Sequence, residues 1–360
     1  MLNFTVGPVQ MGESICRLGA DQVPYFRTPE FSQVMLENER MLLELAQAPQ
    51  GSRAVFLTAS STWAMEASVM NTLSAADKAL VVDGGSFGHR FVQLLEIHGI
   101  PHEVITLAPG ESLRAEHLAP YEGAGITAFL INADETSTGT FYDMGLVADF
   151  CAREDAFFIV DAVSAFLTDA VPMDELGIDV LITGSQKALA VPPGVSVVAL
   201  APRGLDRVAA SDVRCMYFNL ADALKNGERG QTPFTPAVGI LLQVNQRLRD
   251  LVEAGGTQAE LKRAAALAAD FRERIQGMPF TLLSESPANG VTALAVGEGI
   301  SAKELFARLK DEHGIWICPN GGELAETVFR VGHMGALTPA DNEALVTALG
   351  QVLSALKAGE

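Results

Sequence analysis

The sequence is poor in positive charge: its 360 residues include 25 lysines and arginines against 44 aspartates and glutamates, giving a formal net charge of −19. A protein that binds a nucleic-acid backbone needs a surface rich in Lys and Arg to neutralise the phosphates, so this balance argues against nucleic acid as a partner. An anionic membrane surface would repel the chain for the same reason. We therefore expect no nucleic-acid partner and no membrane partner.

Long apolar runs are also missing. No apolar run reaches the length needed to span a bilayer, because Asp161 and Asp169 interrupt the best candidate. The first residues, Met1 to Phe4, contain neither a basic region nor a long apolar stretch, so we expect no secretory signal.

Cysteine and histidine are scarce and scattered. The four cysteines form no CxxC pair, which is typical of reduced thiols in a cytoplasmic protein. His98 and His102 are four residues apart, but Pro101 breaks the helix that a zinc-binding pair would need. We therefore expect a cytoplasmic protein without a metal site.

What the sequence does contain is enough apolar material for a large core, with 48 % hydrophobic and 19 % charged residues. Between residues 54 and 200, short apolar segments alternate with helix-length segments, a pattern that predicts an α/β fold with a mainly parallel, seven-stranded, doubly wound sheet. The predicted strands are Ala54–Thr58, Ala79–Val82, Glu103–Leu107, Thr127–Asn132, Phe157–Val160, Val180–Thr183 and Val195–Leu200. In such sheets ligands bind beyond the carboxyl ends of the strands.

The last hundred residues mix helix and strand signals differently. Thr257 and Ser301 each open a capping-box pattern, and Thr338 precedes a proline that suits the first position of a helix. The strand-like runs among them are Phe280–Leu283, Val291–Val296, Ile315–Cys318 and Thr327–Val331. Together with a length that suggests two domains, this predicts a large domain over residues 1–245 and a smaller C-terminal α+β domain over residues 246–360.

Two polar side chains follow neighbouring apolar strands and are expected at the same sheet edge: Asp161 and Lys187. A lysine in a partly dry pocket can lose its proton and form a Schiff base with a carbonyl. A carboxylate beside a pyridine nitrogen keeps that nitrogen protonated, so the ring can accept electrons. The pair is therefore typical of a pyridoxal-phosphate enzyme. The alternative is that Asp161 caps a turn and Lys187 is solvated.

A phosphate site is predicted where the first strand of the sheet leads into a helix. Ser60, Ser61 and Thr62 follow the strand and precede the helix, whose N-terminal N–H groups and dipole favour an anion. Taken alone, the same hydroxyls could be ordinary helix caps.

These motifs resemble those of the class V aminotransferases, pyridoxal-phosphate enzymes of fold type I that include the alanine–glyoxylate, serine–glyoxylate and 2-aminoethylphosphonate–pyruvate aminotransferases. The resemblance runs from Gly7-Pro8 to the last helix. Its most specific part is the segment Gly184–Leu189, followed by Pro192–Gly194, in combination with Asp161–Val163 upstream.

The resemblance implies roles for individual residues around pyridoxal 5′-phosphate. Lys187 would form the Schiff base and carry the proton, while Asp161 would pair with the pyridine nitrogen. Val163 and Phe87 would lie on the two ring faces, and Thr136 would approach the 3-hydroxyl side. Phosphate ligands would be Ser60, Ser61, Thr62 and Gln186.

The resemblance also implies a homodimer and a substrate clamp. Thr232 and Thr235 match positions that reach the phosphate from the partner subunit, and Arg330 matches the arginine that binds the substrate carboxylate. Relatives commonly have glycine at the position of Ser61 and histidine at that of Phe26. The first departure concerns how closely the backbone approaches the phosphate. The second leaves open how the substrate enters and whether Arg27 contacts it.

The expected activity is transfer of an amino group from a small donor (alanine, serine or 2-aminoethylphosphonate) to pyruvate or glyoxylate. One alternative is a cysteine desulfurase or related lyase, for which Cys318 is the late cysteine. Another is a serine hydrolase, because Gly84–Gly88 fits the pattern G-x-S-x-G with Ser86 as nucleophile and His313 or His333 as its histidine.

Overall fold

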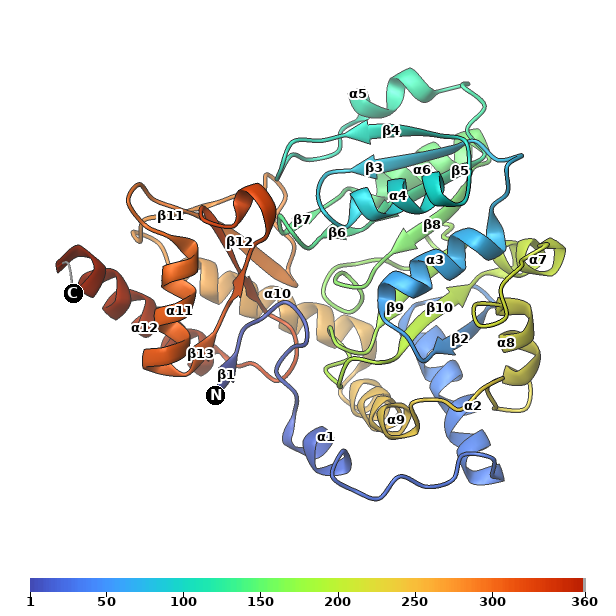
Figure 1. Cartoon of the computed structure of the whole chain (residues 1–360), viewed down its shortest axis with the longest axis horizontal. Helices are drawn as coiled ribbons and strands as arrows, with labels where there is room; N and C mark the ends of the chain where they lie inside the picture. The colour runs from blue at the N-terminus through green and yellow to red at the C-terminus, as the bar shows by residue number, and fades with distance from the viewer. Residues whose placement is uncertain (359–360) are drawn as a thin grey trace.

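The apolar runs between residues 54 and 200 form one seven-stranded sheet in the computed structural model of the chain, which describes residues 1–358 (Figure 1). Strand β10 is antiparallel to both of its neighbours, and the other adjacent strands are parallel. From edge to edge the strands are β2 (Arg53–Leu57), β10 (Ser196–Leu200), β9 (Val180–Gly184), β8 (Phe157–Asp161), β5 (Ala128–Asn132), β3 (Ala79–Asp83) and β4 (His102–Thr106). The mainly parallel seven-stranded sheet is confirmed, and each predicted strand end lies within one residue of its observed position.

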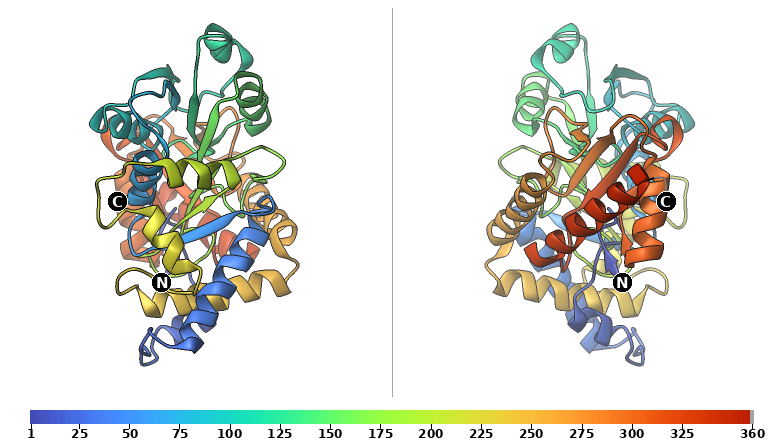
Figure 2. Two further views of the ribbon diagram at one scale, coloured as in Figure 1. Left: turned by 90° about the vertical axis from the view of Figure 1, so that its right-hand side faces the viewer. Right: turned by 90° about the vertical axis from the view of Figure 1, so that its left-hand side faces the viewer.

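Helices cover both faces of this sheet, which explains why its strands are apolar almost throughout (Figure 2). Successive side chains point to opposite faces, so Phe158 packs in one core while Phe157 and Ile159 pack in the other. The first core is covered by α1 (Glu13–Leu18), α2 (Pro29–Leu45), α6 (Met144–Glu154) and α9 (Val238–Glu253). The second is covered by α3 (Ser61–Thr72), α4 (Gly88–Ile97), α7 (Pro202–Ala210) and α8 (Leu220–Gly227).

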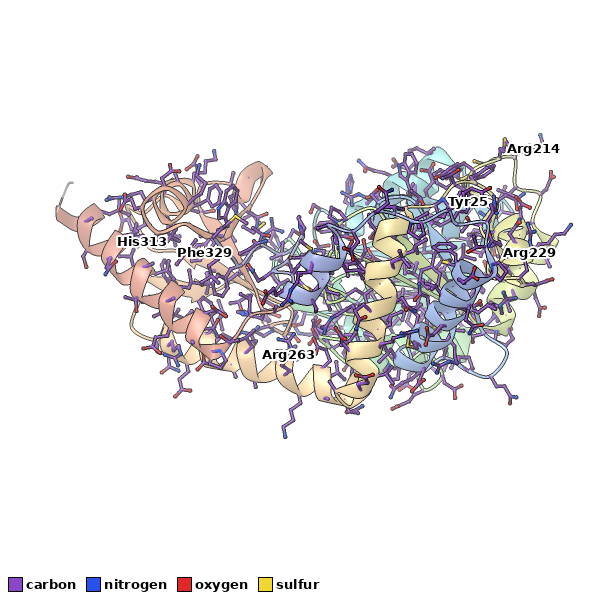
Figure 3. The ribbon with its side chains drawn as sticks, turned by 90° about the horizontal axis from the view of Figure 1, so that it is seen from below. Tyr25, Arg214, Arg229, Arg263, His313 and Phe329 are labelled. Carbon is purple, nitrogen blue, oxygen red and sulfur yellow. The ribbon has the colours of Figure 1, made fainter. Side chains whose placement is uncertain are left out.

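The C-terminal region forms a second, antiparallel sheet with its own core. Its strands, in order, are β11 (Phe280–Leu282), β12 (Val291–Val296), β15 (Val328–Gly332) and β14 (Cys318–Pro319). Its helices are α10 (Gly256–Arg274), α11 (Ala302–His313) and α12 (Pro339–Ala358). Seen from below, α10 runs from the large sheet towards the part of the molecule that holds Phe329 and His313 (Figure 3). The smaller α+β unit is thus present, while the domain boundary after residue 245, which falls within α9, stays a prediction.

The start of the chain lies with this C-terminal sheet rather than with the large one. Strand β1 (Leu2–Asn3) pairs in parallel with β13 (Ile315–Trp316), and Phe4 is fully buried in the C-terminal core. The segment that follows crosses back towards the large sheet, because the amide of Val9 donates to the carbonyl oxygen of Gln186. This crossing brings residues 6–9 to the carboxyl end of β9.

Two of the three predicted helix caps are confirmed. The Ser301 hydroxyl accepts from the amide of Glu304 at the start of α11, and α12 begins at Pro339 after Thr338. The cap predicted at Thr257 is wrong: α10 begins one residue earlier, and the Thr257 hydroxyl donates to the carbonyl oxygen of Leu45. The run predicted as one strand at residues 315–318 is divided between β13 and β14, which belong to different sheets.

The remaining short elements are α5 (Ala115–Leu118), the 3₁₀ turns η1 (Ala119–Tyr121) and η2 (Gly322–Leu324), and the hairpin of β6 (Asp134–Glu135) and β7 (Thr140–Phe141). Within residues 1–358, no helix is both long and apolar enough to cross a membrane.

Candidate active site

Asp161 and Lys187 meet at one edge of the large sheet. Asp161 is the last residue of β8, and Lys187 comes three residues after the end of β9, the parallel neighbour of β8. Both side chains are buried, with relative exposures of 6 % and 7 %. The sheet therefore brings together the two residues on which the sequence hypothesis depends, and neither is a solvated surface group.

The environment of Lys187 makes its amine lose a proton more readily than that of an exposed lysine. Burial lowers the pKa of Lys187 to about 8, while the negative charges of Asp134 and Asp161 act in the opposite direction. Its Nζ donates a hydrogen bond to the carbonyl oxygen of Val6 at 2.5 Å. Gly7 permits this approach, because a Cβ at that position would lie 2.9 Å from Cε of the lysine. The N-terminal segment thus covers the lysine and keeps water from it.

A backbone amide fixes the carboxyl group of Asp161 in a buried position that suits a neighbouring positive charge. Its Oδ1 accepts a hydrogen bond from the amide of Val163 at 2.9 Å, which fixes the direction of the carboxyl group. Burial raises the pKa of Asp161 to about 6, and the Val163 amide and the charge of Lys187 partly offset this effect. A positive charge placed beside Asp161 would relieve the desolvation of its anionic form.

The predicted phosphate ligands gather at the N-terminus of α3. Ser60 is its N-cap residue, but its hydroxyl makes no capping bond to the helix. The side-chain Nε2 of Gln186 donates to the Ser61 hydroxyl at 3.3 Å, while the Thr62 hydroxyl accepts from the Arg90 guanidinium at 3.0 Å. The 12-residue helix presents its first N–H groups here, so the geometry suits an anion.

Phe87 stands at the start of α4, where a buried carboxylate holds the backbone. Glu135 accepts from the amides of Phe87 at 3.4 Å and Gly88 at 2.9 Å, and also from the side chain of Asn132 at 2.9 Å. The Arg90 guanidinium lies 5.0 Å from the centre of the Phe87 ring, on which it stacks. Glu135 was not predicted from the sequence, although it lies three residues beyond the apolar strand β5, much as Asp161 stands at the end of β8.

Arg330 enters the site from the C-terminal sheet. It is buried on β15, and its Nη1 donates to the carbonyl oxygen of Thr136 at 3.1 Å, while Nη2 donates to that of Pro319 at 2.9 Å. Its Nε has no hydrogen-bond partner within residues 1–358. The Thr136 hydroxyl bonds to that of Ser164 at 2.7 Å. Arg330 is therefore no surface ion-pair residue but a link between the C-terminal sheet and the turn that joins β6 to β7.

Three further candidates lie apart from this group. Thr232 and the exposed Thr235 belong to a segment beside β2, and the Thr232 hydroxyl donates to the carbonyl oxygen of Phe234 at 2.7 Å. The guanidinium of Arg27 is occupied by the same segment, where it donates to the side chain of Gln231 at 3.0 Å and to the carbonyl of Thr232 at 2.8 Å. Within one chain, these residues have no hydrogen bond to Lys187, Asp161 or Arg330 among those described.

The residues of the alternative hypotheses are engaged elsewhere. The ring of His333 is fully buried, and its Nε2 bonds to the Thr292 hydroxyl at 2.7 Å rather than to Ser86. Cys318 is half-buried on β14, and its Sγ accepts a hydrogen bond from Arg330 at 3.3 Å, so it is part of a strand and not of a free loop. Among the residues that the structure describes, no group of three His, Cys, Asp or Glu side chains could hold a metal ion.

Known proteins resemble this chain over nearly its whole length. The family described as aminotransferase class-V matches residues 25–336. An L-aspartate–glyoxylate aminotransferase of Paracoccus denitrificans is 29 % identical over 350 residues, which cover 94 % of this chain and 87 % of the relative. A soluble hydrogenase 42 kDa subunit of Anabaena cylindrica is 30 % identical and covers 96 % of this chain and 91 % of its own. The crystal structure of an aspartate aminotransferase from Thermus thermophilus has a TM-score of 0.91 at 28 % identity, covering 99 % of this chain and 100 % of that one.

Proposed function

Because the chain belongs to the class V aminotransferase family, we propose that it moves an amino group from a small amino-acid or aminophosphonate donor to pyruvate or glyoxylate, with pyridoxal 5′-phosphate at Lys187. The observation that carries this proposal is the buried pair at one sheet edge: a lysine whose pKa is lowered and a carboxylate whose pKa is raised. The Paracoccus relative, an L-aspartate–glyoxylate aminotransferase, supports an oxo-acid acceptor of this size.

The described residues fit the phosphate of this cofactor. The N-terminus of α3 offers backbone N–H groups, and the Ser60 hydroxyl is not used for capping. Gly184 leaves room for the Ser61 hydroxyl, because a Cβ at that glycine would lie 2.2 Å from its Oγ. An anionic group of the size of a phosphate is what such a helix terminus with hydroxyls accommodates.

The residues also fit the ring. The anionic form of Asp161 is penalised by burial, and a protonated ring nitrogen would remove that penalty while Asp161 accepts its hydrogen bond. Phe87 and Val163, which would lie on the two ring faces, are both partly buried and held by backbone bonds. When bound, the cofactor supplies an aldehyde that condenses with amines and a ring that accepts electrons.

Lys187 is the base of the proposed reaction. With a pKa near 8, a fraction of its amine is uncharged at neutral pH, whereas an exposed lysine would be almost wholly protonated. Its Nζ takes the proton from the α-carbon of the donor and holds it for return after the electrons have moved. The carbonyl oxygen of Val6 orients Nζ, and the segment around Gly7 excludes water from it.

Arg330 binds the carboxylate of the substrate. The carbonyl oxygens of Thr136 and Pro319 hold the two Nη atoms, so the guanidinium plane is fixed before a substrate arrives. A guanidinium has five N–H donors, so it can bind a carboxylate while these bonds persist. Preorganisation of this kind lowers the entropy lost when the substrate is oriented.

We also propose that the active form is a homodimer in the cytoplasm. Large apolar side chains are exposed near the segment of Thr235: Met216 is 79 % exposed, Trp63 47 % and Tyr217 41 %. Tyr217 stacks on Phe234 at a centroid distance of 5.4 Å, so these side chains form a rigid apolar surface. Analytical ultracentrifugation should give twice the chain mass, and a monomer would contradict the proposal. The four free cysteines favour the cytoplasm.

The central test is the identity of the lysine that carries the cofactor. Borohydride treatment of the loaded enzyme should fix the cofactor on the peptide that contains Lys187, as read by mass spectrometry. Lys187→Ala should abolish the adduct and transamination, while Lys262→Ala, which removes an exposed lysine, should change neither. An adduct that persists in Lys187→Ala would refute the assignment. Loss of the bound cofactor's absorbance with a panel of amines would then identify the donor.

A further inference from the structure

Arg90, in the first turn of α4, is a half-buried arginine whose charge has no acidic partner on the page of contacts it makes. Among the described residues, its guanidinium contacts the hydroxyl of Thr62 and the ring of Phe87, and it forms no ion pair with a carboxylate. Glu135, the carboxylate at the N-terminus of α4, accepts instead from the amides of Phe87 and Gly88. A cation in this turn also opposes the dipole of its own helix, whose positive end is the N-terminus. The charge of Arg90 is thus not neutralised within residues 1–358.

The first contact of Arg90 sets the direction of a hydroxyl group. A guanidinium has donors and no acceptor, so the Thr62 hydroxyl must be the acceptor in its 3.0 Å bond with Nη1 of Arg90. The hydrogen of that hydroxyl is not used in this bond, and it has no acceptor in the part of the chain that the structure describes. Thr62 is the second residue of α3, next to the backbone N–H groups that begin the helix. Its hydroxyl is therefore left to donate to an anion at this helix terminus.

The second contact of Arg90 fixes an aromatic ring. Its guanidinium carbon lies 5.0 Å from the centroid of the Phe87 ring, within the range of a cation–π contact. The guanidinium covers one face of the ring, which leaves the opposite face for another planar group. The charge of Arg90 also acts to lower the pKa of Asp161, the residue assigned to the ring nitrogen. One side chain therefore contacts both the hydroxyl assigned to the phosphate and the ring assigned to stacking.

We propose that Arg90 is a positioning residue of the cofactor site, which turns the Thr62 hydroxyl towards the phosphate and holds the Phe87 ring against the ring of the cofactor. This inference rests on the proposed function, which assigns the phosphate to the start of α3 and the ring to Phe87. The unpaired charge of Arg90 adds to the local positive potential that attracts a phosphate into a protein with a net charge of −19. The phosphate in turn brings the negative charge that Arg90 lacks.

The test measures the binding of pyridoxamine 5′-phosphate to the cofactor-free full chain by fluorescence titration. This compound has an amine in place of the aldehyde, so its affinity does not depend on a Schiff base at Lys187. Arg90→Met and Thr62→Val should each weaken binding by about tenfold or more, because a hydrogen bond to a charged group is lost or misdirected. Arg153→Met is the matched control, since it removes an exposed arginine at the end of α6, and it should bind as the wild type does.

The double variant Arg90→Met/Thr62→Val decides whether the arginine acts through the hydroxyl. Residues that act as a unit have non-additive effects, so the double variant should bind within about threefold of the weaker single variant. If the two losses multiply, Arg90 does not direct the Thr62 hydroxyl, and the proposal is overturned. It is equally overturned if Arg90→Met binds as tightly as the wild type.

A second variant tests the contact with Phe87 and does not depend on the folding of Arg90→Met. Arg90→Lys keeps a positive charge and a donor for Thr62 but lacks the planar group that covers the ring. It should bind more tightly than Arg90→Met, yet the near-ultraviolet circular dichroism of the saturated ligand should be weaker than in the wild type. A signal of wild-type strength would contradict the role at Phe87. Failure of the wild type to bind would refute the proposed function itself, whereas tight wild-type binding with unchanged variants refutes only this inference.

Discussion

The raised pKa of Asp161 predicts that Asp161→Asn should gain stability relative to the wild type as the pH rises, although the same variant should lose activity. In the folded chain its pKa is about 6, whereas the ordinary value is 3.8. A group whose folded pKa is raised contributes stability that is fully present below the unfolded pKa and is lost as pH rises through the folded pKa. The shift of about 2 units corresponds to about 3 kcal/mol, because one unit is worth about 1.4 kcal/mol. The side-chain oxygen of Asn in Asp161→Asn can still accept a hydrogen bond from the Val163 amide, but the side chain does not ionise. This variant should therefore not lose stability as the pH rises.

The assay is urea unfolding of the cofactor-free wild type and variant between pH 4.5 and pH 8. Over that range, linkage predicts that the stability of Asp161→Asn should rise by about 2 kcal/mol relative to the wild type, whatever constant difference the amide brings. Cofactor should reverse the trend at pH 8, because only the carboxylate gains a cationic ring nitrogen. Transamination by the variant should fall by several orders of magnitude. Parallel pH dependences for the two proteins would refute the reasoning, because they would show that Asp161 titrates normally.

Three other substitutions test the parts around this pair. Glu135→Gln places amide hydrogens against the backbone N–H of Gly88, so unfolding free energy should fall by about 2 kcal/mol or more, measured by urea titration; an exposed control, Glu96→Gln, should stay within about 0.5 kcal/mol of the wild type. Gly184→Ala adds a Cβ against the Ser61 hydroxyl, so cofactor affinity, followed by fluorescence titration, should fall about tenfold or more; unchanged affinity would show that this hydroxyl can move aside. Arg330→Lys removes the planar guanidinium group that can form two parallel hydrogen bonds with a carboxylate, so KM for the donor should rise more than kcat falls. A fall in kcat with unchanged KM would contradict the proposed role of Arg330 in binding the substrate carboxylate.

The large sheet was predictable because its signals are local. Most of its strands are continuous apolar runs between polar loops, because helices cover both faces of the sheet; the edge strand β4, His-Glu-Val-Ile-Thr, is the exception. Asp161 and Lys187 could be placed for the same reason: a residue at the end of a parallel strand lies at a known edge of the sheet. The roles given to Phe87, Thr136 and Arg330 rested on the family resemblance, since nothing in their local sequence indicates a ligand.

What the sequence could not predict depends on contacts between distant segments. Thr257 has the pattern of a helix cap, yet its hydroxyl bonds to the carbonyl of Leu45, which is 212 residues away. The run at residues 315–318 is apolar throughout, yet its first half pairs with the first residues of the chain and its second half with β15. In both cases a tertiary partner determines the outcome, and the local pattern does not contain that partner.

Asp134 and Glu135 show why charge and local sequence pattern do not predict the surroundings of a side chain, even for two adjacent residues. Both are acidic, both are buried, and both belong to β6, but their side chains point to opposite sides of the strand. Glu135 meets the amide groups of Phe87 and Gly88 at the start of α4, so its carboxylate is satisfied. Asp134 meets no such amide groups: neither of its carboxylate oxygens has a hydrogen-bond partner among the described residues, and burial raises its pKa well above the usual value. The state of each buried acid is therefore set by the N–H groups that the rest of the chain brings to each side of one short strand.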